Sequence, residues 1–133
     1  MDPGSSASLP FERIGGAASV VALVERFYDA VDELEPDLAR LHPCEEGKVS
    51  RASRERFSLF LIGWLGGPQD YMQLHGHPRL RLRHAHVPVD ERMRDAWLRC
   101  MRVALADPSI DADLRTALDR RFAELANFLR NHP

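Results

Sequence analysis

The sequence predicts an all-α protein, and three observations carry that prediction. Apolar residues recur at three- and four-residue spacing in four separate windows, as they do along one face of a helix. Glycine and proline stand between these windows and mark where helices end. No window alternates convincingly between apolar and polar residues at the period of two that a half-buried strand requires. We therefore expect four substantial helices and one long irregular connection.

The first two helices lie in the N-terminal half. The first follows Gly15-Gly16, and Pro36 ends or kinks it before a short further turn. The second is capped by Ser50 or Ser53 and stops at Gly66-Gly67-Pro68. The expected apolar stripes are Val21, Val24, Phe27, Tyr28, Val31 and Leu34 for the first helix, and Phe57, Phe60, Leu61 and Trp64 for the second. The polar segment 44–50 between them is predicted to be a loop.

The last two helices lie in the C-terminal third. One opens near Asp90, with Glu91 in the first turn where the helix dipole favours an acid, and breaks at Asp107-Pro108-Ser109. The other runs from about residue 111 to 131. Their expected inward faces are Met93, Trp97, Cys100, Met101 and Ala104, then Leu114, Leu118, Phe122, Leu125 and Phe128 or Leu129.

The connection over residues 69–89 is irregular and rich in histidine. A structureless stretch of this length inside a small domain is usually functional, so it is the first indication of a site. It holds His75, His77, His84 and His86. A zinc cluster is one interpretation of these histidines, but no acidic or cysteine ligand lies nearby in the sequence, so we do not favour it.

Length and composition exclude several classes of protein. The chain has 133 residues, enough for one domain with a core of ordinary size. Residues 1–10 are expected to form a disordered tail, and residues 11–133 the domain. The net charge of -2 gives no case for binding nucleic acid or an anionic membrane. Without a signal peptide or an apolar span, the chain is expected to be cytoplasmic. Cys44 and Cys100 are interpreted as ordinary reduced thiols.

His84 is the strongest candidate ligand in the irregular connection. A helical domain can hold a large flat cofactor between facing helices if it offers an apolar slot and an axial ligand. Arginines at 79, 81 and 83 precede His84, where cations would balance the propionates of a heme. Spacing alone favours the other interpretation, a solvated surface histidine beside arginines.

Three further residues are candidates for the opposite side of such a slot. Tyr28 and Trp97 are polar-tipped aromatic residues in apolar stripes, where each polar group needs a partner. Core packing explains them as well, with the hydroxyl reaching a backbone carbonyl. His42 follows a short helical turn and either points into a cavity or lies in a wet corner.

Taken together and in order, these motifs resemble the group II truncated hemoglobins. The most specific stretch runs from Trp64-Leu65-Gly66-Gly67-Pro68 through Tyr71 to the run Gly76–His84, and continues from Arg94 to Met101. The Phe27-Tyr28 pair and the breaks Gly15-Gly16 and Gly66-Gly67 also stand where that family has them. The similarity covers nearly all of residues 11–131. The sequence departs from the family at His86-Val87-Pro88-Val89, where a Pro-Phe pair is usual, at the bulky Phe57, and in a longer loop over 44–50.

The resemblance implies a truncated globin, a two-over-two helical sandwich around heme b. It implies His84 as the iron ligand and Arg83 as a propionate partner. On the distal side it implies Tyr28, His42 and Trp97 as the groups that bind the ligand, with Ser53 and Phe57 on the distal helix. Further heme contacts implied by the resemblance are Phe60, Leu61, Tyr71, Val89 and Met101.

The function that follows from this site is the binding of dioxygen or another diatomic ligand at a heme iron. Bound dioxygen carries partial negative charge, so three hydrogen-bonding groups around it would slow its release. A pocket of this kind suits redox chemistry such as nitric oxide oxidation or peroxide reduction, with His42 as a possible proton donor and an unidentified reductase. The alternatives are a non-enzymatic oxygen carrier or sensor and a cofactor-free helical module. We expect a monomer or a homodimer.

Overall fold

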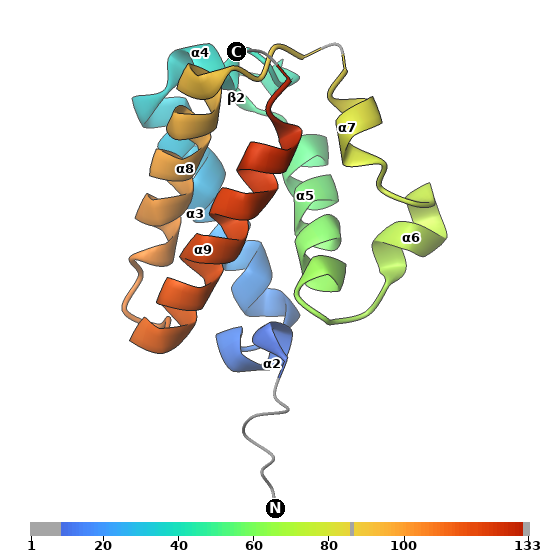
Figure 1. Ribbon diagram of the computed structural model, residues 1–133, viewed down its shortest axis with the longest axis vertical. Helices are drawn as coiled ribbons and strands as arrows, with labels where there is room; N and C mark the ends of the chain where they lie inside the picture. The colour runs from blue at the N-terminus through green and yellow to red at the C-terminus, as the bar shows by residue number, and fades with distance from the viewer. Residues whose placement is uncertain (1–8, 86, 132–133) are drawn as a thin grey trace, which may run out of the picture.

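Four long helices form the body of the protein in the computed structural model, which describes residues 9–85 and 87–131 (Figure 1). They are α3 (Ala17–Leu34), α5 (Arg51–Trp64), α8 (Glu91–Leu105) and α9 (Ala112–Leu129). These are the four substantial helices that the apolar spacing predicts, so the all-α fold class is confirmed.

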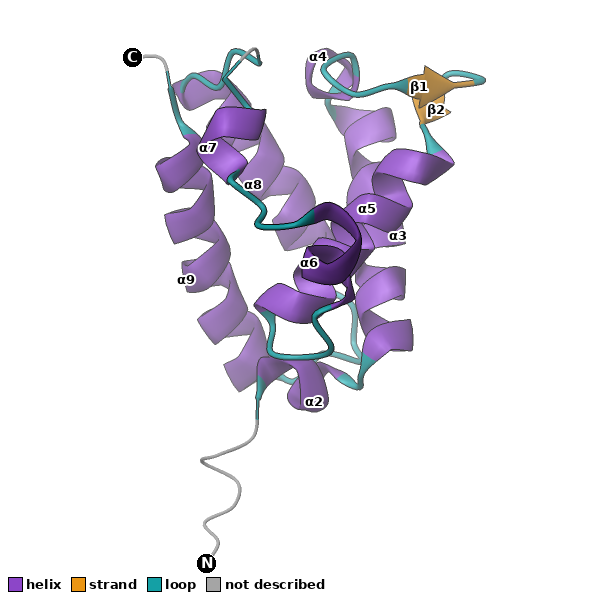
Figure 2. Ribbon diagram, turned by 90° about the vertical axis from the view of Figure 1, so that its right-hand side faces the viewer, coloured by secondary structure: helices purple, strands orange, loops and turns teal. Residues whose placement is uncertain are grey.

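The long helices are arranged as two antiparallel pairs. In Figure 2 α3 and α5 form one layer and α8 and α9 the other. Helix α3 packs against both α5 and α8 and so joins the layers. The core lies between them and is almost entirely apolar, as a helical sandwich requires.

The shorter elements surround the open side of the sandwich. Helix α2 (Pro10–Ile14) lies at the N-terminal end, α4 (Pro36–Ala39) follows α3, α6 (Asp70–His75) packs against α5, and α7 (Leu80–Arg83) packs against α9 (Figures 1 and 2). The last two occupy the stretch predicted to be irregular. Since α2 begins at Pro10, the predicted tail ends there, and its residues 1–8 lie outside the described residues.

A small antiparallel hairpin replaces the loop predicted over residues 44–50. Strands β1 (Cys44–Glu45) and β2 (Lys48–Val49) pair Cys44 with Val49 and Glu45 with Lys48. The turn residues Glu46 and Gly47 both have positive φ, 53° and 79°, as a tight hairpin turn needs. Strands of two residues are too short to leave an alternating pattern, so the prediction of a plain loop was wrong.

Side-chain caps start three of the long helices at the positions that the sequence indicates. Ser50, not Ser53, caps α5 by accepting a hydrogen bond from the Ser53 backbone N–H. Asp90 accepts from the N–H of Met93 at 2.8 Å and starts α8. Asp111 accepts from the N–H of Leu114 at 3.1 Å and starts α9.

The core departs from the predicted stripes at three residues. Val21, Leu34 and Phe128 are exposed, whereas Val20, Leu23 and Ala126 are buried. The buried face of α3 is therefore rotated slightly from the stripe that its large residues suggest. Phe128 is covered on one side by the guanidinium of Arg81, 5.3 Å above its ring, while Leu129 faces a cavity.

Gly67 marks a close approach between the end of α5 and the N-terminal helix. A Cβ atom there would stand 2.7 Å from the ring of Phe11 and 2.9 Å from the Ile62 carbonyl oxygen. Only glycine fits at this position. Helix α5 itself ends at Trp64, and the chain leaves it through Gly66, whose φ of 103° is left-handed. The Phe11 N–H donates to the carbonyl of Leu65 at 2.9 Å and fastens α2 beside it.

Candidate functional site

Two adjoining cavities open on the side of the sandwich where α7 lies. The larger has a volume of about 440 Å³ and the smaller about 170 Å³. They share the side chains His42, His84, Trp97, Leu125 and Leu129, so they are two parts of one slot. The larger part alone falls within the 300–1,000 Å³ typical of small-molecule sites.

His84 lines both parts of the slot and is prepared as a metal ligand. It follows α7, and its backbone N–H and its ring Nδ1 both point to the Leu80 carbonyl oxygen, at 3.0 and 2.7 Å. A carbonyl oxygen can only accept, so Nδ1 carries the proton. The Nε2 lone pair is then free for a metal, the arrangement that metal-binding histidines use.

Tyr28 brings an unsatisfied buried hydroxyl to the larger cavity. It projects from α3, is 5% exposed, and makes no hydrogen bond with any residue that the structure describes. Burial raises the pKa of Tyr28, so the phenol keeps its proton. A buried donor without a protein partner is costly, which indicates that a ligand satisfies it.

Trp97 supplies a second donor from α8. Its indole N–H has no partner within the described part of the chain, and its ring lines both cavities. Aromatic neighbours hold it: Phe27 lies at 5.2 Å and Phe122 at 5.7 Å between ring centroids. Phe57 contacts both Trp97 and Tyr28, at 6.3 and 5.8 Å, and so fixes one donor relative to the other.

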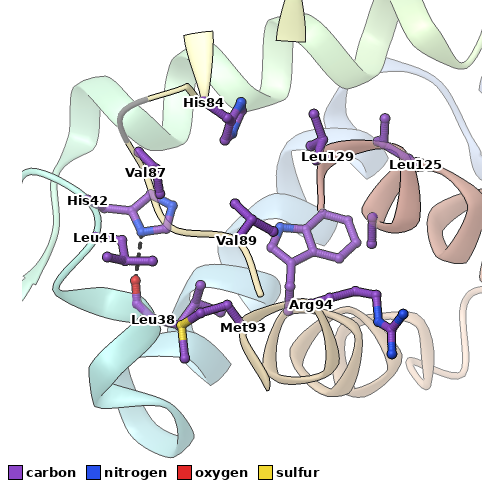
Figure 3. A pocket seen from close by; sticks show the side chains of 12 residues that line it. Leu38, Leu41, His42, His84, Val87, Val89, Met93, Arg94, Leu125 and Leu129 are labelled. Carbon is purple, nitrogen blue, oxygen red and sulfur yellow. Dashed lines mark hydrogen bonds between the residues drawn. The ribbon is translucent and has the colours of Figure 1, made fainter. Parts of the chain in front are cut away.

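His42 also lines the slot, and the structure shows whether its ring can donate or accept a hydrogen bond there, which the sequence does not. Its Nδ1 donates to the carbonyl of Leu38 at 3.0 Å, and Figure 3 shows the other ring nitrogen away from that bond. Burial is the main cause that lowers the pKa of His42, so the ring is neutral at pH 7. Its Nε2 is then an acceptor. The expectation that His42 donates a proton or a hydrogen bond into the pocket does not fit this geometry.

Most of the predicted cofactor contacts come together around the slot. Ser53, Phe57, Phe60 and Tyr71 line the larger part, and Val89 lines the smaller part. Leu61 and Met101 are buried behind it and line neither part. Arg83 belongs to α7, but its side chain lies outside the described part of the structure.

Arg56 is a residue of the larger cavity that the sequence reasoning missed. Its side chain is exposed on α5, and it forms no ion pair with the residues that the structure describes. A free cation at the mouth of an apolar slot suits a ligand that carries carboxylates. Because Arg56 stands in a helix with several arginines, only the fold distinguishes it from them.

Arg54 was also missed, and it supports the site from behind. Its guanidinium pairs with Glu25, Asp29 and Asp32 of α3 at 2.8, 2.9 and 2.7 Å, and its Nε donates to the Val49 carbonyl. The same guanidinium lies 5.7 Å from the centroid of the Tyr28 ring. The network therefore fastens α5 and the hairpin to the face of α3 that carries Tyr28.

This arrangement fits a flat, mostly apolar cofactor with a metal at its centre. Two imidazoles with a free Nε2, those of His42 and His84, face the slot, and two unpaired donors project into it from α3 and α8. Among the described residues, no group of three or more His, Cys, Asp or Glu could hold a metal ion. His86 lies outside the described residues. Of the described helices, none has the length and apolar character needed to cross a membrane.

Sequence comparison places the chain among known proteins. The profile of the family called bacterial-like globin matches residues 10–131. The chain is 34% identical over 128 residues to the group 2 truncated hemoglobin YjbI of Bacillus subtilis, covering 96% of this chain and 92% of that protein. It is 32% identical over 120 residues to the group 2 truncated hemoglobin 3-1 of Lotus japonicus, covering 90% and 70%.

Solved structures agree with the sequence comparison. The group II truncated hemoglobin of Bacillus anthracis superposes with a TM-score of 0.86 at 34% identity, covering 95% of this chain and 93% of the other. The group II 2-on-2 hemoglobin of Agrobacterium tumefaciens gives a TM-score of 0.84 at 37% identity, covering 95% and 96%.

Proposed function

Because the chain belongs to the bacterial-like globin family as a group 2 truncated hemoglobin with a heme cofactor, we propose that His84 binds the heme iron and that the pocket holds dioxygen for redox chemistry. Members of this family bind diatomic ligands at heme. The reaction proposed is nitric oxide oxidation or peroxide reduction, for which the heme supplies a redox-active iron. Sustained turnover of either reaction needs an electron donor, so the proposal includes a separate reductase.

The observation that carries the proposal is the unsatisfied hydroxyl of Tyr28. It lies in the slot that His84 also lines, beside the equally unpaired indole N–H of Trp97. Each neutral hydrogen bond is worth about 0.5–1.5 kcal/mol net, which corresponds to about 2- to 10-fold in a dissociation rate. Two such donors would hold dioxygen tightly. Slow release disfavours oxygen delivery and favours chemistry on the held ligand.

The remaining lining residues would position the heme and exclude water. Phe57, Phe60 and Tyr71 form an apolar wall of rings in contact, with Phe60 between the other two. Arg56 would pair with a propionate at the cavity mouth, and we propose the same role for Arg83. An apolar wall strengthens every hydrogen bond made inside it, because it lowers the local dielectric constant.

Two dissociation rates test the distal part of the proposal. Tyr28→Phe and Trp97→Phe each remove one donor and keep the ring, so each is expected to raise the dioxygen dissociation rate about 2- to 10-fold. Leu118→Val is the matched control, because Leu118 is fully buried on α9 and lines neither cavity. Stopped-flow displacement of dioxygen by carbon monoxide measures the rates. Unchanged rates in both aromatic variants would remove the distal donors from the account.

A carrier or sensor without enzymatic activity is the second candidate function. Its pocket would hold dioxygen in the same way but would not turn over. Mixing the oxygenated protein with nitric oxide, and the ferric protein with peroxide, separates the two. With a reductant present, many turnovers per heme support the redox function, whereas conversion that stops after one equivalent supports the carrier.

A further inference from the structure

We propose that Asn131 is a positioning residue that fixes His84 in the slot and thereby sets the bond between His84 and the heme iron. The inference rests on the proposed function, since it takes His84 as the ligand. Asn131 lies just beyond the C-terminal end of α9, and in Figure 1 this end runs beside the segment that joins α7 to α8.

Asn131 makes four hydrogen bonds to the segment that carries His84. Its Nδ2 donates to the carbonyls of His84 and Val87, at 3.1 and 3.0 Å. Its Oδ1 accepts from the N–H of Val89 at 2.8 Å, and its own N–H donates to the carbonyl of Val89 at 2.8 Å. One side chain therefore uses both its donor and its acceptor groups on three residues that line the slot.

His84 is thus held from two directions. The Leu80 carbonyl fixes the ring through Nδ1, and Asn131 fixes the backbone through the His84 carbonyl. Neither contact is sufficient alone. The bond to Leu80 leaves the backbone of His84 free to shift, and the bond to Asn131 leaves the ring free to rotate about its bond to the backbone. Together they define where Nε2 points.

The attachment matters because α7 depends on α9 for its position. Helix α7 has a single turn, which is too short to be stable without packing. It packs against α9, where the guanidinium of Arg81 covers Phe128. That contact holds the start of the α7 segment, and Asn131 holds its end.

Groups that orient a metal-binding histidine affect the metal strongly. Replacing such a group typically costs 10–100-fold in affinity for the metal. Asn131 is exposed, so water replaces some of its hydrogen bonds when it is removed, and global stability is a poor measure of its role. Spectroscopy of the iron–histidine bond is the direct measure.

The test uses Asn131→Ala and Asn131→Asp in the heme-bound protein. The aspartate variant keeps an acceptor for the Val89 N–H but cannot donate to His84 and Val87, so it isolates the two donated bonds. Thr116→Ala is the matched control: Thr116 is exposed on the same helix, its hydroxyl donates to the Ala112 carbonyl at 3.1 Å, and it lines neither cavity. Resonance Raman spectra of the ferrous protein report the iron–histidine stretching band, and transfer of heme to excess apomyoglobin reports heme loss.

Both Asn131 variants are expected to shift or broaden the iron–histidine band and to lose heme about tenfold faster. Thr116→Ala is expected to match the unmodified protein in both measurements. A band and a heme-loss rate that do not respond to either Asn131 variant overturn the inference and leave the proposed function standing. The absence of any iron–histidine band in the unmodified protein overturns both.

Discussion

At the scale of single residues, Tyr28 and His42 present opposite polarities to the same slot. Their rings meet edge to face with centroids 5.5 Å apart. Tyr28 keeps its proton because burial raises its pKa, whereas the pKa of His42 is lowered and its proton is already donated to Leu38. One residue can donate to a ligand and the other can only accept from one.

Replacement of His42 tests this polarity. His42→Phe removes an acceptor that cannot bond to the partly negative dioxygen, so the dissociation rate at pH 7.5 is expected to stay within about twofold of the original. His42→Gln introduces an amide N–H donor and is expected to slow dissociation. Rapid-mixing kinetics of both variants provides the measurement. If His42→Phe releases dioxygen severalfold faster, then His42 is a donor and the assigned tautomer is wrong.

The sequence predicted which residues form the site better than it predicted what each of them does there. Tyr28, His42, Trp97 and His84 were singled out, and the fold brings all four to one slot. The tautomer of His42 depends on the Leu38 carbonyl, four residues earlier. The finding that Leu61 and Met101 are buried without lining the slot depends on how their two helices pack. Neither is encoded in local spacing, so these details needed the structure.

At the scale of secondary-structure elements, Arg54 joins α5, α3 and the hairpin. Its side chain is 6% exposed, and Asp32 beside it is 13% exposed. Asp32 also accepts from the Val49 N–H at 3.1 Å, so the hairpin is part of the same network. The hairpin that the sequence did not predict is therefore anchored by an arginine that the sequence did not single out. An arginine in an arginine-rich helix looks solvated until its three carboxylates are seen on another helix.

Arg54→Met is expected to destabilise the protein by about 3 kcal/mol, because it leaves the nearly buried Asp32 without its cation. The value lies at the low end for a broken buried pair, since Asp29 is 68% exposed and can return to water. Arg51→Met is the matched control. Arg51 lies on the same helix and shares Glu25, but it is 59% exposed, so its replacement is expected to destabilise the protein far less. Urea denaturation of the heme-bound proteins measures the difference, and equal midpoints for the two variants would contradict it.

At the scale of the whole molecule, the two helical pairs leave their slot on the side where α7 lies. The long helices were predictable because each has an apolar face and a clear end, and three of the four have a side-chain cap. The packing of α6 and α7 was not, since both are short and their stretch has no periodicity. The position of α7 follows from α9, through Arg81 on Phe128 and through Asn131, whereas α6 packs against α5. The site therefore forms only when the whole chain has folded, because its polar side chains come from α3, α8 and the α7 segment.

The central claim is that His84 binds the heme iron through Nε2, and one measurement tests it most directly. Resonance Raman spectra of the ferrous protein are compared with those of His84→Gly, with and without added imidazole. We expect an iron–histidine stretching band in the unmodified protein, its loss in His84→Gly, and its return when imidazole fills the space left by the side chain. An unchanged band in His84→Gly without imidazole would contradict the claim, because another residue would then hold the iron.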